Sequence, residues 1–202
     1  MTIRFHVPAR RLVVIPKDHV EAAKDFARLR VRDTYSDSLQ SDPLKIERDI
    51  LVGALAELAV HHFLPGCPYP DFNYYAGEKK SWQADFIYRG DYLGCKGQWE
   101  SVARSHGMSW MFQWDSLTGR KDKILQNPVG LHAFCLVKDS DPSRVAIQAI
   151  VKSKDVLHSD SPFLELPNAT YLQKYKRCIY FNTLKKGIEE GAIEDIADQL
   201  AT

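Results

Sequence analysis

The chain has 202 residues and a formal net charge of +1, with 45% hydrophobic and 26% charged residues, values that are typical of a folded globular domain. They exclude a disordered chain, a collagen-like repeat and a protein that is basic over its whole surface. No apolar run approaches the roughly 20 residues that span a bilayer, and arginines interrupt the apolar residues near the N-terminus, which argues against a signal peptide. We therefore predict a cytoplasmic, non-membrane protein.

Helices are predicted before and after a strand-rich centre. Apolar residues recur at helical spacing from Asp18 to about Asp33, and a longer apolar helix is expected from about Leu44 to Leu64, where Pro65-Gly66 ends it. Strands are expected at 83–88, 92–98, 131–139, 143–152 and 178–181, and C-terminal helices at 182–190 and 192–200. This order predicts an α/β domain, bordering on α+β, with a small mixed sheet flanked by helices.

A single domain over 1–202 is expected, with parts of different character. The parts are an N-terminal helical extension (1–43), a core (44–185) and a C-terminal helix (186–202). The four cysteines are far apart and form no CxxC pair, so a structural zinc site is not expected.

Glu57 lies in the middle of the long apolar helix. Its neighbours on the same helical face are small or apolar, and they include Gly53, Ala54 and Val60. A carboxylate in such surroundings is costly unless a cation, a metal or a donor accompanies it. A simple ion pair to a nearby Lys or Arg would also satisfy Glu57.

A β-hairpin is predicted over residues 83–98. A type II′ turn at Gly90-Asp91 would place Asp85 directly opposite Lys96 on one sheet face, with Gln98 on the same face. The other face would be core, because it carries Phe86, Tyr88, Leu93 and Cys95. Taken alone, Asp85 and Lys96 would be an ordinary cross-strand ion pair.

A helix acid, then a strand Asp, then a strand Lys resembles the PD-(D/E)XK nuclease superfamily, which has the restriction-endonuclease-like fold. The resemblance covers about residues 46–185 and is carried by GALAELAVHHFL, with Gly53 and Glu57, and by ADFIYRGDYLGCKGQ, with Asp85 and Lys96. It is strongest to small single-domain nucleases of phages and mobile elements, which would place the protein in the host cytoplasm. Dimers are common among such nucleases, so the resemblance leaves a homodimer open.

The resemblance implies a site for Mg²⁺ or Mn²⁺ that hydrolyses DNA. Glu57 and Asp85 would bind the metal, which polarises a phosphate oxygen and acidifies a water. Lys96 would orient that water or stabilise the developing charge, and Gln98 would contact the scissile phosphate or the water.

The chain departs from the family pattern at Gly94, where an Asp or Glu is expected two residues before the Lys. Three explanations stay open. A carboxylate has migrated, with Glu57 as the favoured source and Glu78 or Glu100 as others; a backbone carbonyl and water suffice; or the protein is an inactive module that binds DNA or a host protein.

Basic and aromatic residues between 99 and 123 predict contact with DNA, by stacking and by phosphate pairing. An equally good interpretation is a Trp-rich core with a solvated basic loop. The candidate DNA-binding residues are Arg104, Arg120, Lys121 and Lys123, together with Lys79 and Lys80 in an earlier loop.

Overall fold

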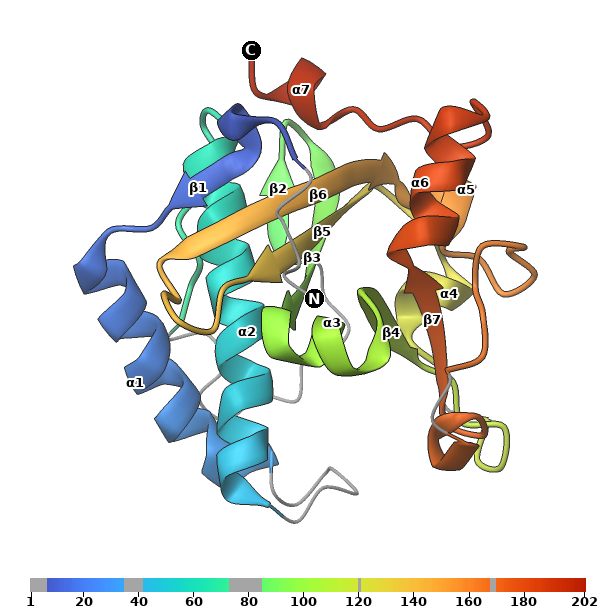
Figure 1. The fold of residues 1–202 in the computed structure, drawn as a ribbon, viewed down its shortest axis with the longest axis horizontal. Helices are drawn as coiled ribbons and strands as arrows, with labels where there is room; N and C mark the ends of the chain where they lie inside the picture. Colours follow the sequence, from blue (N-terminus) through green and yellow to red (C-terminus); the bar gives the residue numbers. More distant parts are fainter. Residues whose placement is uncertain (1–6, 35–41, 73–84, 120, 168–169) are drawn as a thin grey trace.

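A computed structural model describes residues 7–34, 42–72, 85–119, 121–167 and 170–202. Its helices are α1 (Lys17–Thr34), α2 (Pro43–Phe63), α3 (Glu100–His106), α4 (Lys123–Gln126), α5 (Ser153–Val156), α6 (Phe181–Glu189) and α7 (Ala197–Leu200), with 3-10 turns η1 (Ala9–Arg11) and η2 (Thr170–Leu172). The strands are β1 (Leu12–Val14), β2 (Phe86–Tyr88), β3 (Asp91–Trp99), β4 (Ser109–Gln113), β5 (Leu131–Val137), β6 (Arg144–Lys152) and β7 (Lys176–Tyr180). Figure 1 shows this mixed α/β arrangement.

A five-stranded mixed sheet in the order β1-β6-β5-β3-β2 forms the centre. Only the β3–β5 pair is parallel, and the β1–β6, β5–β6 and β2–β3 pairs are antiparallel. Strands β4 and β7 form a separate antiparallel pair. Every residue of β5 is buried, as expected for a strand that is covered on both faces.

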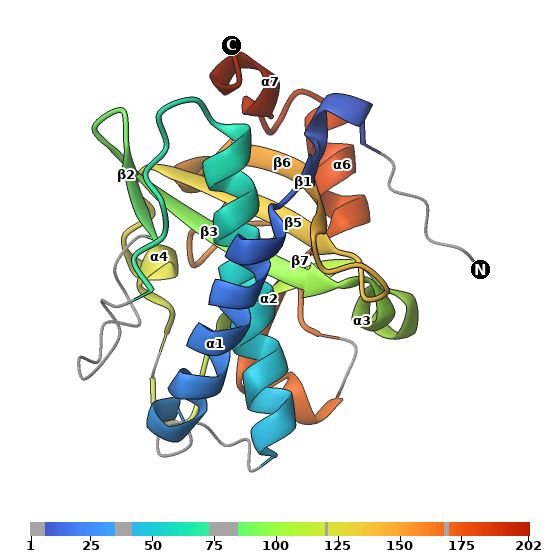
Figure 2. The same cartoon turned by 90° about the vertical axis from the view of Figure 1, so that its left-hand side faces the viewer.

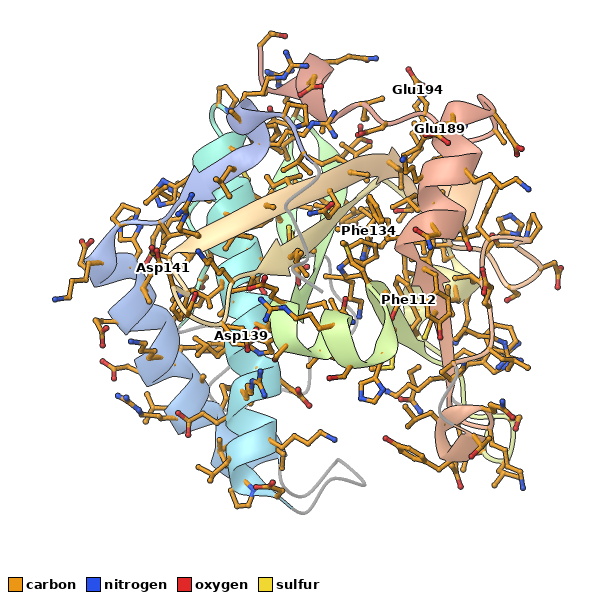
Figure 3. All side chains as sticks on the ribbon, in the orientation of Figure 1. Phe112, Phe134, Asp139, Asp141, Glu189 and Glu194 are labelled. Atoms are coloured by element: carbon orange, nitrogen blue, oxygen red, sulfur yellow. The ribbon has the colours of Figure 1, made fainter. Side chains whose placement is uncertain are left out.

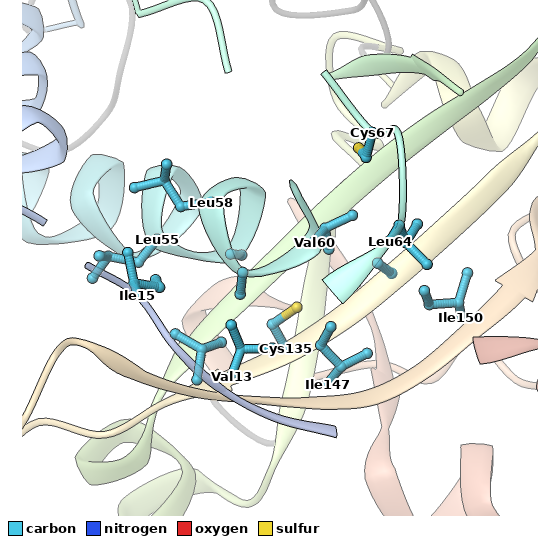
Figure 4. Packing of buried hydrophobic residues seen from close by; sticks show 14 of the residues in the cluster. Val13, Ile15, Leu55, Leu58, Val60, Leu64, Cys67, Cys135, Ile147 and Ile150 are labelled. Carbon is cyan, nitrogen blue, oxygen red and sulfur yellow. The ribbon is translucent and has the colours of Figure 1, made fainter. Parts of the chain in front are cut away.

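Helix α2 covers one face of the central sheet. Asp42 caps its start by accepting hydrogen bonds from the backbone N–H groups of Leu44 and Lys45, at 3.0 and 3.4 Å. The helix ends before Leu64, and Pro65-Gly66 follows, so the predicted long helix is confirmed within one residue at each end. Figure 2 shows α1 outside α2 and both helices in front of the sheet. Figure 4 shows the resulting core, in which Leu55 and Val60 of α2 face Cys135 and Ile147 of the sheet.

A second hydrophobic core lies on the opposite face of the sheet. Trp110 and Phe112 of β4 pack there against Phe134 of β5, together with apolar residues of β7 and α6. Figure 3 shows Phe112 and Phe134 between the central sheet and the β7–α6 segment. The two faces of the central sheet are thus covered by different cores, with α2 on one face and β4 on the other.

The N-terminal segment is more than an extension, because β1 forms the edge strand beside β6. Buried Arg11 holds this segment to the C-terminus through ion pairs to Asp195 (2.5 Å) and Asp198 (2.8 Å). The helix expected over 192–200 is shorter in the structure, where only Ala197–Leu200 are helical. None of the helices in the described ranges is long and apolar enough to cross a membrane.

Candidate active site

The β2–β3 hairpin brings Asp85 to the edge of β3, but through a different turn from the one predicted. The pairs Phe86–Leu93 and Tyr88–Asp91 make Arg89-Gly90 the turn, and both turn residues have positive φ, at 50° and 87°. This is the type I′ pattern, not type II′. Continuing the register by one residue places Asp85 opposite Gly94, so the predicted pairing of Asp85 with Lys96 is wrong by two residues, although the face is kept.

The Asp85 carboxylate is hydrogen-bonded to the backbone of β3 at this edge. Its Oδ2 accepts a hydrogen bond of 2.5 Å from the backbone N–H of Cys95. Burial raises the pKa of Asp85 to about 6, although the Cys95 hydrogen bond and the charge of Lys96 both act to lower it. Asp85 is therefore a desolvated acid, anchored by its backbone neighbour and close enough to Lys96 to feel its charge.

Glu57 reaches the same edge from α2. The helix approaches β3 closely at Gly97, where a Cβ would lie only 2.4 Å from the carbonyl oxygen of Val52. Burial, and then the charge of Asp85, raise the pKa of Glu57 well above its usual value. Two acids separated by 28 positions in the sequence therefore repel each other in a shielded place.

Lys96 projects from the face of β3 opposite α2, beside an acid that the sequence did not single out. Its Nζ is 3.5 Å from Oδ2 of Asp122 and 5.0 Å from the centre of the Phe112 ring. The charge of Asp122 also raises the pKa of Asp85, so Asp85 is subject to both charges of this ion pair. About a third of the Lys96 side chain is exposed, which leaves the ammonium accessible to a ligand.

His132 of β5 fills the space beside Gly94. The two residues are register partners in the parallel β3–β5 pair, and a Cβ at position 94 would lie 2.7 Å from Cε1 and Nδ1 of the His132 ring. Burial, and then the charge of Lys96, lower the pKa of His132 to about 3, so the ring is neutral. A side chain at position 94 would therefore clash with the His132 ring.

Gln98 was predicted to contact the phosphate or the attacking water, but its side chain is already engaged by backbone groups. It is buried, its Nε2 donates to the carbonyl of Gly107 at 3.2 Å, and its Oε1 accepts from the backbone N–H of Ser109 at 2.8 Å. Gln98 thus holds the turn between α3 and β4. Glu100, one suggested source of a migrated carboxylate, is buried and paired with Arg104.

One of the predicted DNA-binding residues, Lys121, lies beside Trp114, together with basic residues of β7 that were not predicted. Lys121 Nζ lies 4.1 Å and Arg177 Cζ lies 4.7 Å from the centre of the Trp114 ring, and an isolated bridge pairs Trp114 with Lys121. Next to it on β7, Lys176 Nζ donates to Oε1 of Gln113 at 2.7 Å. We call Trp114, Lys121, Lys176 and Arg177 the Trp114 platform. It adjoins the acidic site, because Lys121 directly precedes Asp122.

The other predicted DNA-binding residues lie elsewhere. Lys123 is exposed at the start of α4. Arg104 lies on α3, beyond the carboxyl end of β3, where its guanidinium pairs with Glu100. Lys79, Lys80 and Arg120 fall outside the described residues, as does Glu78.

The acids present fit a divalent cation in their chemistry. Glu57 and Asp85 are half-buried, burial raises the pKa of each, and the charge of Asp85 raises the pKa of Glu57 further; a bound cation would offset both effects. In the part of the chain that the structure describes, no three His, Cys, Asp or Glu side chains already lie in the arrangement of a metal centre. Mg²⁺ and Mn²⁺ do not need three protein ligands, since they bind through one or two carboxylates and retain several waters.

Asp122 and His132 are the site residues that sequence reasoning missed. Asp122 stands between two lysines in a segment interpreted as basic, and nothing local indicates that it turns to Lys96. The sequence held a weak signal for His132, since it stands between Leu131 and Ala133 as the one polar residue in an otherwise apolar strand. No protein-family model, no curated protein and no solved structure matches this chain.

Proposed function

We propose that the protein is a metal-dependent nuclease that hydrolyses DNA phosphodiester bonds. The observation that carries this proposal is the electrostatic link between Glu57, Asp85 and Lys96 around β3, where the charge of Lys96 lowers the pKa of Asp85 and the charge of Asp85 raises the pKa of Glu57. A helix acid, a strand acid and a strand lysine with this proximity are the side chains that such hydrolysis uses.

The fold is compatible with a restriction-endonuclease-like nuclease. The hairpin β2–β3 carries the strand acid and the lysine, β3 continues in parallel with β5, and α2 lies across that face with the helix acid. These relations are those that the sequence resemblance implies, and they support assigning the finer fold as part of the same proposal.

In this mechanism each side chain has a separate task. Glu57 and Asp85 hold the cation, which when bound polarises a phosphate oxygen and lowers the pKa of a water. The backbone N–H of Cys95 fixes the orientation of the Asp85 carboxylate. Lys96 stabilises the charge that develops on the phosphate, because its ammonium is exposed and adjoins the acids without being locked to either.

The Trp114 platform would bind the DNA beside the reacting phosphate. The charged side chains of Lys121, Lys176 and Arg177 pair with phosphates, and the Trp114 indole offers a surface for stacking. Because the net charge of the whole chain is only +1, binding depends on this local surface and weakens steeply with salt.

A nicking assay on supercoiled plasmid with Mg²⁺ or Mn²⁺ tests the proposal. We expect metal-dependent cleavage that falls at least 100-fold in Asp85→Asn and in Lys96→Ala, the range seen when one charged catalytic group is removed. Lys185→Ala serves as the matched control, since Lys185 is an exposed lysine of α6 that pairs within its helix with Glu189. Cleavage that persists in the Asp85 and Lys96 variants contradicts the assignment.

The second candidate is a nuclease-like module that binds DNA or a host protein without cleaving. Two observations favour it: glycine at position 94, and the lack of a preformed three-ligand group among the described residues. DNA binding without cleavage by either metal, on duplex, single-stranded and branched substrates, would support this module over the enzyme.

A further inference from the structure

The ammonium of Lys96 is held by two groups on the face of β3 opposite α2. Its Nζ lies 3.5 Å from Oδ2 of Asp122 and 5.0 Å from the centre of the Phe112 ring. A lysine side chain is a flexible four-carbon stem, so a carboxylate and an aromatic ring that hold its end remove much of its rotamer freedom. Because about a third of the Lys96 side chain stays exposed, the ammonium is restrained and still open to a ligand.

Both groups that hold Lys96 are themselves fixed. Phe112 has no exposed surface and packs in the second hydrophobic core. The backbone N–H of Asp122 donates to the carbonyl of Gln113 at 2.9 Å, and the carbonyl of Asp122 accepts from the N–H of Leu125 at 3.0 Å. The Asp122 carboxylate therefore projects from a backbone that is hydrogen-bonded on both sides.

The Asp122 carboxylate does not serve the helix that it precedes. Asp122 occupies the N-terminal cap position of α4, yet among the described residues its side chain makes no capping hydrogen bond. Aspartate at such a position ordinarily accepts hydrogen bonds from the first N–H groups of the helix. Here the carboxylate is directed to Lys96, so the contact that it makes at this position is the one that holds the lysine.

Asp122 also joins Lys96 to the Trp114 platform. Lys121, the residue before it, forms an isolated bridge with Trp114 and places its ammonium 4.1 Å from the centre of the indole ring. Two consecutive residues thus contact the proposed DNA-binding surface and the lysine of the proposed active site. The position of the Lys96 ammonium relative to the platform is therefore set by the segment that carries Asp122.

We propose that Asp122 is the positioning residue for Lys96. Its carboxylate holds the ammonium beside the Trp114 platform before the substrate arrives, so the charge that develops on the phosphate meets a cation that is already in place. The inference rests on the proposed function for the task of Lys96, and it gives Asp122 no contact with the metal or the DNA.

Proton–carbon NMR of the full chain with ¹³Cε-labelled lysine tests this role without relying on activity. We expect the Lys96 signal, identified by its loss in Lys96→Arg, to be shifted upfield by the ring current of Phe112. Asp122→Asn should move this signal toward the position of exposed lysines such as Lys185, whereas Asp160→Asn, at an exposed acid, should leave it unchanged. A Lys96 signal that is the same in Asp122→Asn and in the unchanged protein overturns the proposal.

The rate of plasmid nicking supplies a second measurement. Asp122→Asn should lower kcat by about tenfold or more without raising KM for DNA, since Asp122 acts through Lys96 and not on the DNA. Asp122→Glu, which keeps the charge on a longer side chain, should retain more activity than Asp122→Asn. In a double-mutant cycle, Asp122→Asn should cost nothing further in the Lys96→Ala protein. Additive losses, or a kcat that rises in Asp122→Asn, overturn the positioning role.

The two proposals fail in different ways. A Lys96 signal that depends on Asp122 in a protein that cleaves no DNA supports the hold of Asp122 on the ammonium and removes the nuclease function. Metal-dependent cleavage in which neither the Lys96 signal nor kcat responds to Asp122→Asn keeps the function and removes Asp122 from the site.

Discussion

At the scale of single residues, the site is defined by acids that are held in an unfavourable state. The pKa of Asp85 is raised to about 6 and that of Glu57 is also raised, in both cases chiefly by burial. Such residues cost stability at neutral pH unless something binds them, which is typical of functional positions. The strain of this site is therefore electrostatic and not conformational.

Removing either charge should stabilise the metal-free protein. A folded-state pKa above the unfolded value means that the folded state binds more protons, so stability is highest below pH 4 for this group and falls as pH rises through about 6. Asp85→Asn should therefore raise the free energy of unfolding at pH 7.5 by about 1–3 kcal/mol, as measured by urea denaturation with a chelator present.

With Mn²⁺ present, the unchanged protein should become the more stable of the two, since it alone gains stability from the cation. Asp160→Asn, which changes an exposed acid, serves as the control, and its free energy of unfolding should match that of the unchanged protein with and without Mn²⁺. A metal-free Asp85→Asn protein that is less stable than the unchanged one at pH 7.5 would contradict the electrostatic explanation.

Position 94 should tolerate nothing larger than glycine while His132 is present. A Cβ would meet the His132 ring at 2.7 Å, so Gly94→Ala should cost about 1–3 kcal/mol of unfolding free energy. Replacing the ring in the double variant Gly94→Ala, His132→Ala should recover part of that cost, which a double-mutant cycle measures. Additive effects in the cycle would show that the two side chains do not compete for one space.

At the scale of elements, the close approach of α2 to β3 sets where Glu57 lies. Gly97 permits this approach, because its missing Cβ would lie 2.4 Å from a backbone oxygen of Val52. Because α2 and β3 each move as a rigid unit, a small displacement of one against the other would move Glu57 away from Asp85.

Gly97→Ala should therefore be severely destabilising, by about 3 kcal/mol or more, because backbone atoms must move apart. It should also weaken Mn²⁺ binding in whatever fraction stays folded. Gly53→Ala is the matched control within α2, since no atom lies within 4 Å of its added Cβ, and it should gain roughly 0.5–1 kcal/mol from helix propensity. Equal stability of the two variants would contradict this packing.

The Trp114 platform joins β4 to β7, and its charges should act on DNA through phosphates alone. Lys121→Ala and Arg177→Ala should each weaken binding uniformly across sequences and reduce the salt slope by about 1, as measured by fluorescence anisotropy between 50 and 200 mM salt. Lys185→Ala, a lysine of α6, should leave the slope unchanged. Unaltered slopes in both platform variants would place the DNA elsewhere.

At the scale of the whole molecule, the sequence located the longer elements but not their contacts, and it predicted neither β1 nor the α3–β4 segment. Helical spacing and the cap and stop signals at Asp42 and Pro65-Gly66 located α2, and alternation located β3, β5 and β6. Turn preference failed at the hairpin, because Arg89 adopts a positive φ that is uncommon for a residue with a side chain. The one-residue change in the turn moved the partner of Asp85 by two.

Long-range placement explains what else could not be foreseen. The edge position of β1 depends on its pairing with β6, more than 130 residues later in the chain, and no local pattern indicates it. Likewise, Asp122 reaches Lys96 only because β4 and α4 close over the second face of the sheet. Glu57, Asp85 and Lys96 are linked electrostatically, while Gln98 is held by backbone groups. Alternation gives the face of a residue but not its partners.

Anomalous diffraction from a crystal soaked in Mn²⁺ measures the central claim most directly. One Mn²⁺ ion is expected at the edge of β3, within coordinating distance of the Asp85 carboxylate, with Glu57 bound directly or through a water. A fully occupied Mn²⁺ found only at other places, or Glu57 and Asp85 turned away from each other in the soaked crystal, would contradict it.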